Sequence, residues 1–506
     1  MSIVGFISGR ANRISRRLQE NRTHSRIEVE SDDIDAADDA KLEMSRDRTS
    51  WDCLPPEIRN EILGLLPVLG GRCSLLATVS RAWQSIIEPR NFAEISLTVP
   101  RLADLNSQAI LFRKRSHIRY IWFRVELKHY DCSQCANTDR DRWGLDNIDN
   151  QFIADAFESL FTTLSAWEPR GDLVLDISVY SPSDNQHWFK YLSFCSDTDL
   201  GECPSRRGHE QGTTPINDPA HGWVAGQQFL APEYLAIEQT FDEIMGEGPF
   251  DDEEPEMQWW RGLPLVPVVG VVLLRQQTRR RWKPVALANM LTRFPNMKEL
   301  CYEPWREVPN PAVSRKLAHA SLHFTTLSTS FMADASYFFA ARQDSWTWDK
   351  LTFLTLTSRV LTDDADTLDI NNMLRDAAAA ALKMPRLDTM ELWNGRRGVA
   401  MLFRYQRALD GQSVIITVRG TSELALGIAT TQAWDVAAHR HCHGGVVVQT
   451  SSIDPDAIQC HGDAIRQLGL STEVARPVSL RQILSEHRFR AWDHHHHHHH
   501  AEDLVQ

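Results

Sequence analysis

The stretch LPPEIRNEILGLLPVLGGRCSLLATVSRAWQSII, from Leu54 to Ile87, predicts two short amphipathic helices. The first begins at the two prolines after Leu54, because proline in a first turn lacks only an N–H that would have no helical partner there. Pro67 ends this helix, and the pair Gly70-Gly71 makes a turn. One apolar stripe runs along the first helix, made by Ile58, Ile62, Leu65 and Leu66.

The second helix is expected over residues 75–87, with a broader apolar face than an ordinary surface helix has. A hairpin of two helices this short seldom buries enough surface to fold without help. Part of its apolar surface should therefore contact either a partner protein or the rest of the chain, and the pattern alone leaves both possibilities open. The broad face is made by Leu75, Leu76, Val79, Ala82, Trp83, Ile86 and Ile87.

The identities of these residues resemble the F-box. Leu54-Pro55-x-Glu57 opens the motif, and the run CSLLATVSRAWQSIIEPRNFAEISLT resembles more narrowly the F-box proteins of filamentous ascomycete fungi. In that family the helices dock on the small Skp-type adaptor of a cullin–RING ubiquitin ligase. The resemblance covers a small part of the chain, and it implies that the adaptor is contacted by Leu54, Pro55, Ile58, Ile62, Leu66, Leu76, Val79 and Trp83.

The function that this resemblance implies is that of a substrate-recognition subunit in an SCF-type ubiquitin ligase. Its partners would be the Skp-type adaptor, through it the cullin, and an unknown protein substrate. The chain itself would not be an enzyme, because the RING subunit and a conjugating enzyme carry out the chemistry in that family. Two alternatives stay open: an F-box protein of a non-ubiquitin adaptor complex, and an unrecognised enzyme or metal-dependent module capped by the hairpin.

Composition bounds the class of protein. A chain of 506 residues is too long for one small core, so two or more structural units are expected. The net charge of −13 argues against a nucleic-acid partner. Nine cysteines without framework spacing indicate reduced thiols in the cytoplasm or nucleus. The longest apolar run, residues 263–274, is too short for a membrane helix, so no membrane partner is expected.

Four regions are predicted along the chain. Residues 1–48 are polar and charged and are expected to be disordered. The F-box occupies residues 49–97, and an α/β body that presents the substrate occupies 98–492, with a long, partly disordered surface insertion at about 197–253. The tail, 493–506, carries seven consecutive histidines and is expected to be unstructured and to bind metals without specificity.

The body reads as mixed α/β. Residues 118–127 predict a strand, 152–167 a helix, and 173–179 a half-buried strand with strict alternation. This order implies parallel pairing of the two strands. Further on, residues 414–418 and the run GGVVVQT predict strands, and residues 478–489 a final amphipathic helix.

Three segments of the body share the spacing apolar-x-x-apolar-x-apolar, and they begin at Met297, Leu351 and Leu387. A helix is expected after each of the last two. The pattern resembles the strand of leucine-rich repeats, which would make the body an irregular solenoid. The intervals of 54 and 36 residues exceed those of regular repeats, so an ordinary α/β sheet remains the alternative.

The sequence lacks the common signatures of phosphate, dinucleotide, hydrolase and metalloprotease sites, and no cofactor is predicted. Cys132-Ser-Gln-Cys135 has zinc-ligand spacing, but a structural site needs four ligands and no second pair matches. We interpret this pair as free, partly buried cysteines. Cys442 with His441 or His443 could complete a zinc site across the fold, and Cys195 with Cys203 is a poorer option.

Two charged runs are interpreted as solvated edges. Arg279-Arg280-Arg281 follows a buried strand, and its arginines are expected to pair with acids of the preceding loop rather than to bind a phosphate, an acidic degron or an import receptor. The acidic run DDEEPEMQWW, which begins at Asp251, is expected to be the edge of a loop.

Overall fold

The computed structural model describes residues 51–66, 73–139, 144–198, 215–304, 310–409, 411–441, 443–470 and 474–490. The chain divides into two compact units, with the boundary between Glu88 and Pro89. Three expectations lie outside the described residues: the disordered segment 1–48, the turn at 67–71, and the polyhistidine tail.

Among the described residues 51–66 and 73–91, two α-helices and two 3-10 turns form, and the second helix extends past the boundary into the second unit. The helices are α3 (Pro56–Leu65) and α4 (Arg81–Asn91), and the turns are η2 (Trp51–Cys53) and η3 (Leu76–Thr78). A single helix over 75–87 was expected, and this prediction is wrong. The backbone N–H of Trp83 donates to the Ser80 hydroxyl at 3.3 Å, so Ser80 caps a helix that begins only at Arg81.

The second unit is built on an eleven-stranded sheet. Its strands lie side by side in the order of the sequence, which is the order of this list: β1 (Glu94–Thr98), β2 (Tyr120–Glu126), β3 (Leu173–Tyr180), β7 (Val269–Leu274), β9 (Glu299–Tyr302), β10 (Thr326–Asp334), β11 (Phe353–Thr357), β12 (Thr389–Arg396), β13 (Val399–Gln406), β14 (Val414–Gly420) and β15 (Val446–Ser452).

The pairing makes the sheet mixed. Strands β1 to β12 pair in parallel, β13 is antiparallel to both of its neighbours, and β15 is parallel to β14. The predicted α/β class and the parallel pairing of β2 with β3 are therefore confirmed. Strand β3 was expected to be half-buried, but all its side chains except that of Val174 are buried, because it lies inside the sheet with both faces covered.

The segment after β12 differs from the expected helix. Arg396 leads into Gly398, whose φ of +73° lets the chain turn back at once, so that β13 pairs antiparallel with β12. The predicted strands at 118–127, 414–418 and GGVVVQT are confirmed as β2, β14 and β15.

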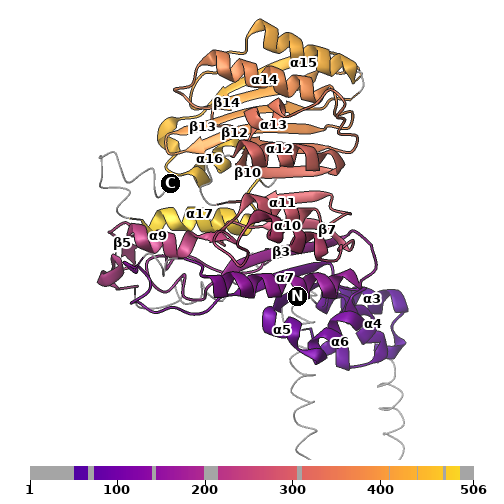
Figure 1. The fold of residues 1–506 in the computed structure, drawn as a ribbon. Helices are drawn as coiled ribbons and strands as arrows, with labels where there is room; N and C mark the ends of the chain where they lie inside the picture. The colour runs from indigo at the N-terminus through magenta and orange to yellow at the C-terminus, as the bar shows by residue number, and fades with distance from the viewer. Residues whose placement is uncertain are drawn as a thin grey trace, which may run out of the picture. The chain divides into compact units, whose positions relative to one another are not determined.

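Helices cover one face of the sheet and stack on one another in chain order from α10 to α15 (Figure 1). The large hydrophobic core lies between this layer and the sheet. The helices of this unit are α5 (Val99–Ala103), α6 (Leu105–Lys114), α7 (Asn147–Ser165), α9 (Tyr234–Phe241), α10 (Glu253–Gly262), α11 (Pro284–Leu291), α12 (Pro311–Ala320), α13 (Ala335–Ala340), α14 (Thr367–Ala381), α15 (Ile428–Arg440), α16 (His461–Leu468) and α17 (Pro477–Phe489).

The opposite face of the sheet has its own cover. Helix α16 packs on β12 and β13, where Trp393 and Leu402 form a second core with Ala464 and Leu468. Helix α17 confirms the predicted final amphipathic helix, in which Ile483 is buried and Leu480 and Leu484 are partly buried. Its buried side also holds the polar side chains of Ser479, Gln482 and Glu486.

The predicted surface insertion is folded over residues 215–253 and includes α9. It contains η5 (Pro219–His221) and two small sheets, in which β4 (Trp223–Val224) pairs with β5 (Gln227–Gln228) and β6 (Glu243–Ile244) with β8 (Arg281–Trp282). Trp223 and Ile244 are fully buried, so a few large side chains supply a core to an otherwise polar segment.

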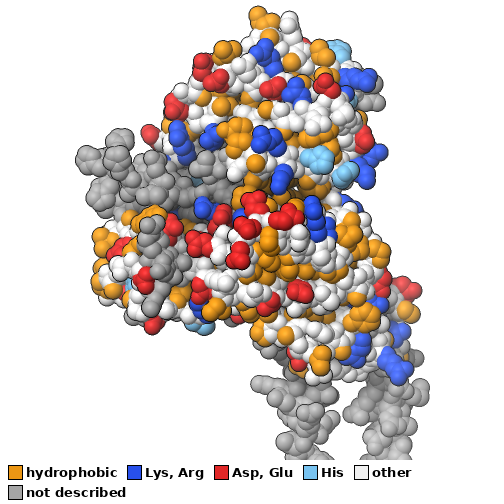
Figure 2. All heavy atoms as spheres, in the orientation of Figure 1, with side chains coloured by type: hydrophobic (Ala, Val, Ile, Leu, Met, Phe, Trp, Pro, Cys, Tyr) orange, Lys and Arg blue, Asp and Glu red, His pale blue; other side chains and the backbone are white. Residues whose placement is uncertain are grey.

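Two further boundaries differ from expectation. Strand β1, placed with the F-box in the predicted region 49–97, instead pairs with β2 in the large sheet. The acidic run forms the start of α10, with Trp260 buried and Glu253 and Glu254 at its positive N-terminal end. Figure 2 shows acidic side chains gathered near this helix. Within the described ranges, no helix is both long and apolar enough to cross a membrane.

Candidate functional site

The residues expected to contact an adaptor fall into two groups by exposure. Pro55, Ile58 and Val79 are exposed, with 42% of Ile58 and 55% of Val79 accessible to solvent. The remaining five are partly covered: Leu54, Ile62, Leu66, Leu76 and Trp83. Leu65 and Leu75, on the same predicted faces, are also exposed. This unit therefore presents several large apolar side chains to solvent.

Trp83 has a contact within its own unit. Its ring lies against that of Trp51, with centroids 5.1 Å apart and planes tilted by 52°. An aromatic pair of this kind stabilises the unit that contains it. A substitution at Trp83 would therefore disturb folding as well as any adaptor contact, whereas Ile58 and Val79 offer cleaner tests.

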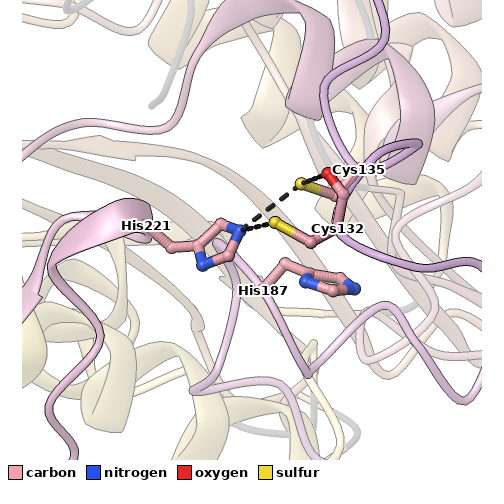
Figure 3. Close-up of side chains that lie close together, drawn as sticks. All are labelled: Cys132, Cys135, His187 and His221. Carbon is pink, nitrogen blue, oxygen red and sulfur yellow. Dashed lines mark hydrogen bonds between the residues drawn. The ribbon is translucent and has the colours of Figure 1, made fainter.

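A second candidate site joins Cys132 and Cys135 to two histidines that sequence spacing did not identify. The two thiols lie on a turn after β2, His187 lies in the turns after β3, and His221 ends η5 (Figure 3). One potential ligand atom from each of the four side chains lies within 4.8 Å of the other three. Three segments that are distant in sequence thus bring two thiols and two imidazoles together.

The distances within the cluster are short. His221 Nε2 lies 3.3 Å from Cys132 Sγ and 3.5 Å from Cys135 Sγ. In tetrahedral zinc sites, Zn–S bonds of about 2.3 Å and Zn–N bonds of about 2.05 Å place sulfur and nitrogen about 3.6 Å apart. The spacing in the cluster therefore fits the edge of a coordination tetrahedron.

A carboxylate behind the cluster orients His221. Asp218 Oδ2 lies 2.7 Å from His221 Nδ1, and Lys190 Nζ lies 2.9 Å from the same carboxylate oxygen. Burial opposes ionisation of Asp218, but the hydrogen bonds from Lys190 and His221 outweigh it and hold its pKa below the usual value. The ionised carboxylate accepts from Nδ1–H, which leaves the lone pair of Nε2 directed at the two sulfurs.

Burial favours the neutral forms of two of the four side chains, Cys135 and His187. Burial, reinforced by the neighbouring Cys132 thiol, raises the pKa of Cys135 to about 12. Burial also lowers the pKa of His187. Neutral imidazole is the form that binds metals, and a bound divalent cation would deprotonate the thiols.

Aromatic side chains surround the cluster and form a small core of their own. His221 makes an edge-to-face contact with Trp188, with ring centroids 5.6 Å apart, and His187 stacks on Tyr130 at 5.6 Å. Trp223 donates from its indole N–H to the carbonyl oxygen of Trp188 at 3.1 Å. This core is separate from the large one and consists mainly of Tyr130, Cys135, Trp188, Phe189, Tyr191, Leu192, Trp223 and Ala236.

The complements suggested by sequence lie elsewhere or outside the described residues. His441 Nε2 lies 2.9 Å from the carbonyl oxygen of Ala381, away from the cluster. Cys195 is buried, and its carbonyl oxygen accepts from Arg275. Cys203 and Cys442 are not among the described residues.

The arginine run at 279–281 is not a solvated edge. Arg279 pairs with Glu486 on α17, and Arg280 pairs with Asp184 in the turns after β3; all four side chains are buried. Only Arg281 is largely exposed, and it lies 3.6 Å from Glu243. The run therefore holds together segments that cover the second face of the sheet.

The comparisons with known proteins reach only part of this structure. Residues 273–476 match a family described as a family of unknown function (DUF6546). The match begins near the end of β7 and ends just before α17, so it includes neither the helices α3 and α4 nor the cysteine–histidine cluster. No curated protein matches the chain.

Proposed function

We propose that this chain is the substrate-recognition subunit of an SCF-type cullin–RING ubiquitin ligase. Helices α3 and α4 would dock on the Skp-type adaptor, and the α/β body would bind a protein substrate. The observation that carries the proposal is the exposure of Ile58 and Val79 at positions where the F-box resemblance expects adaptor contacts. Burying these apolar side chains in a partner would remove them from water, which would stabilise the complex.

We infer further that the body is an irregular repeat related to leucine-rich repeats. Paired residues of successive parallel strands are separated by nearly constant intervals: Val271, Glu299, Thr326 and Phe353 follow one another at 28, 27 and 27 residues. The next interval, from Phe353 to Thr389, is 36 residues. Strand β10 lies between two of the segments noticed in the sequence and halves their 54-residue interval. Regular intervals, parallel strands and a helical layer on one face support a repeat with an extended binding surface.

Introducing negative charges at the exposed positions tests the adaptor contact. Ile58→Glu combined with Val79→Glu should weaken adaptor binding more than ~100-fold, because each substitution replaces an apolar anchor with a charge and costs ~2 kcal/mol or more. The measurement is co-purification of the Skp-type adaptor and cullin with the full chain. Both positions are already solvated, so the double variant should unfold at the same urea concentration as the natural chain.

The matched control is Ile428→Glu, which places the same charge at an exposed isoleucine on α15 in the second unit. It should leave adaptor and cullin in the purified complex. Equal recovery of the adaptor with the double variant and with the control would overturn the proposal. Recovery of the adaptor without cullin would instead indicate a non-ubiquitin adaptor complex.

A further inference from the structure

We propose that Cys132, Cys135, His187 and His221 bind one Zn²⁺ ion in a closed structural site. The side chains come from three segments, around residues 132–135, 187 and 221, and one potential ligand atom of each lies within 4.8 Å of the others. Such convergence of thiols and imidazoles is independent of the adaptor contact, because it lies in the second unit and uses none of the residues of α3 or α4.

The two sulfur atoms of the cluster converge on one ring nitrogen of His221. With Nδ1–H of His221 directed at Asp218, the ring has one lone pair, on Nε2, yet two sulfur atoms lie within 3.5 Å of it. The carbonyl oxygen of Cys132 lies 3.3 Å from Cys135 Sγ and accepts its S–H, which leaves Nε2 to accept from Cys132. The convergence of all four side chains, rather than an unmet hydrogen bond, points to an ion. A cation placed among the four side chains takes a lone pair from each of them at once.

The donor set selects the metal and its role. Two sulfurs and two imidazole nitrogens in tetrahedral spacing are typical ligands of Zn²⁺, and Mg²⁺ or Ca²⁺ would require oxygen ligands. Four protein ligands leave no position for water or substrate, which characterises structural rather than catalytic zinc. Asp218 completes the arrangement as the carboxylate that orients a metal-bound histidine, and Lys190 holds that carboxylate.

The ion would fasten together the segments that surround the small aromatic core. This core is small, and it is separate from the main core of the sheet. Small modules of this kind commonly need a metal or a disulfide to stay folded. Zinc binding would therefore fix the loop that carries His187 and Trp188 against the turn of Cys132 and Cys135.

Zinc content of the full chain is the test. The seven histidines His494–His500 are replaced by asparagine, because they would bind zinc without specificity. After incubation with Zn²⁺ and dialysis, this protein should hold about one zinc per chain. The change Cys135→Ser should reduce this to near zero, whereas Cys53→Ser, which removes an exposed thiol from the first unit, should leave it unchanged.

A gentler variant separates loss of zinc from loss of folding. Asp218→Asn keeps all four ligands and should weaken zinc binding about 10- to 100-fold in competition with a chelator. Cobalt in place of zinc should give the intense visible bands of tetrahedral coordination and a sulfur-to-cobalt charge-transfer band. Cys132, which is exposed, should react with iodoacetamide after chelation and be protected when Zn²⁺ is restored.

Two results would overturn the proposal. One is a zinc content of the asparagine-substituted chain that stays far below one per chain after reconstitution. The other is alkylation of Cys132 at the same rate with and without Zn²⁺, which would leave a thiol–imidazole contact in place of a metal site. Neither result bears on adaptor binding.

Discussion

Replacing Asp176 by asparagine should destabilise the α/β body strongly, because it removes the counter-charge of a buried arginine. Arg275 Nε donates to Asp176 Oδ2 at 2.7 Å, and both side chains are fully buried. The Tyr120 hydroxyl also donates to Asp176. From its other end, Arg275 donates to the carbonyl oxygen of Cys195 at 2.8 Å. The pair thus ties β3 and the end of β7 to the segment that follows His187.

The expected cost follows from the burial of both partners. Removing one member of a buried ion pair costs about 3–5 kcal/mol, whereas an exposed pair contributes about 0–1 kcal/mol. Asparagine has nearly the shape of aspartate and keeps one oxygen acceptor, so the packing changes little. The loss is that of an uncompensated guanidinium, which cannot release its proton. The folding equilibrium constant should fall between about 100- and 5,000-fold.

Equilibrium urea unfolding of the full chain, followed by circular dichroism, measures this cost as a shift of the main transition. Asp363→Asn is the matched control, because Asp363 lies 3.8 Å from Arg396 in an exposed pair. The shift of its urea midpoint should correspond to a change of less than ~0.5 kcal/mol in the free energy of unfolding. A midpoint for Asp176→Asn no lower than that of the control would refute the reasoning. Replacing both partners by Asp176→Leu and Arg275→Met should cost less than the single change.

Three further predictions concern the body. Burial, and then the charges of Arg279 and Arg490, lower the pKa of His461 from 6.5 to about 4. Between these two pH values, His461 is therefore protonated in the unfolded chain but not in the folded chain. Stability should therefore fall by about 2–3 kcal/mol as pH drops from 6.5 to 4, and urea midpoints of His461→Gln should lack this part of the decline. Gly270→Ala should lower the melting temperature, at a cost of about 2 kcal/mol or more, because a Cβ there would lie 2.1 Å from the backbone oxygen of Gly171; an unchanged melting temperature would show that β7 can shift without cost. A fragment of residues 92–506 should elute as a soluble monomer in size-exclusion chromatography, because it keeps β1 as the partner of β2; aggregation would indicate that the helical hairpin is an intrachain cap.

The sequence predicted those parts of the fold in which local pattern and burial agree. The alternation in residues 173–179 identified β3, and the apolar runs identified β2 and β14. Strand β10 was missed because its sequence, TLSTSFMAD, carries small hydroxyl side chains at positions that the sheet buries. The hairpin after β12 was missed because nothing in residues 389–396 distinguishes a strand that turns at Gly398 from one that leads into a helix.

Half of the cysteine–histidine cluster could be predicted from the sequence. The spacing of Cys132 and Cys135 is typical of zinc ligands. His187 and His221 lie 52 and 86 residues beyond Cys135, and only the folded chain brings them close to the two cysteines. A usable signal was the tryptophan within two residues of each histidine, Trp188 and Trp223, since large aromatic side chains in a polar segment indicate a core. The arginine run misled for a similar reason: local charge does not report the buried acids, Asp184 and Glu486, that come from distant segments.

Direct titration of the full chain with purified Skp-type adaptor tests the central claim. Isothermal calorimetry should give a one-to-one complex with a Kd of ~1 μM or tighter, and a negative heat-capacity change from burial of the apolar side chains at Ile58 and Val79. The double variant Ile58→Glu/Val79→Glu should bind more than ~100-fold more weakly. Absence of binding by the natural, folded chain at adaptor concentrations of ~100 μM would contradict the assignment of this protein to an adaptor-based ligase.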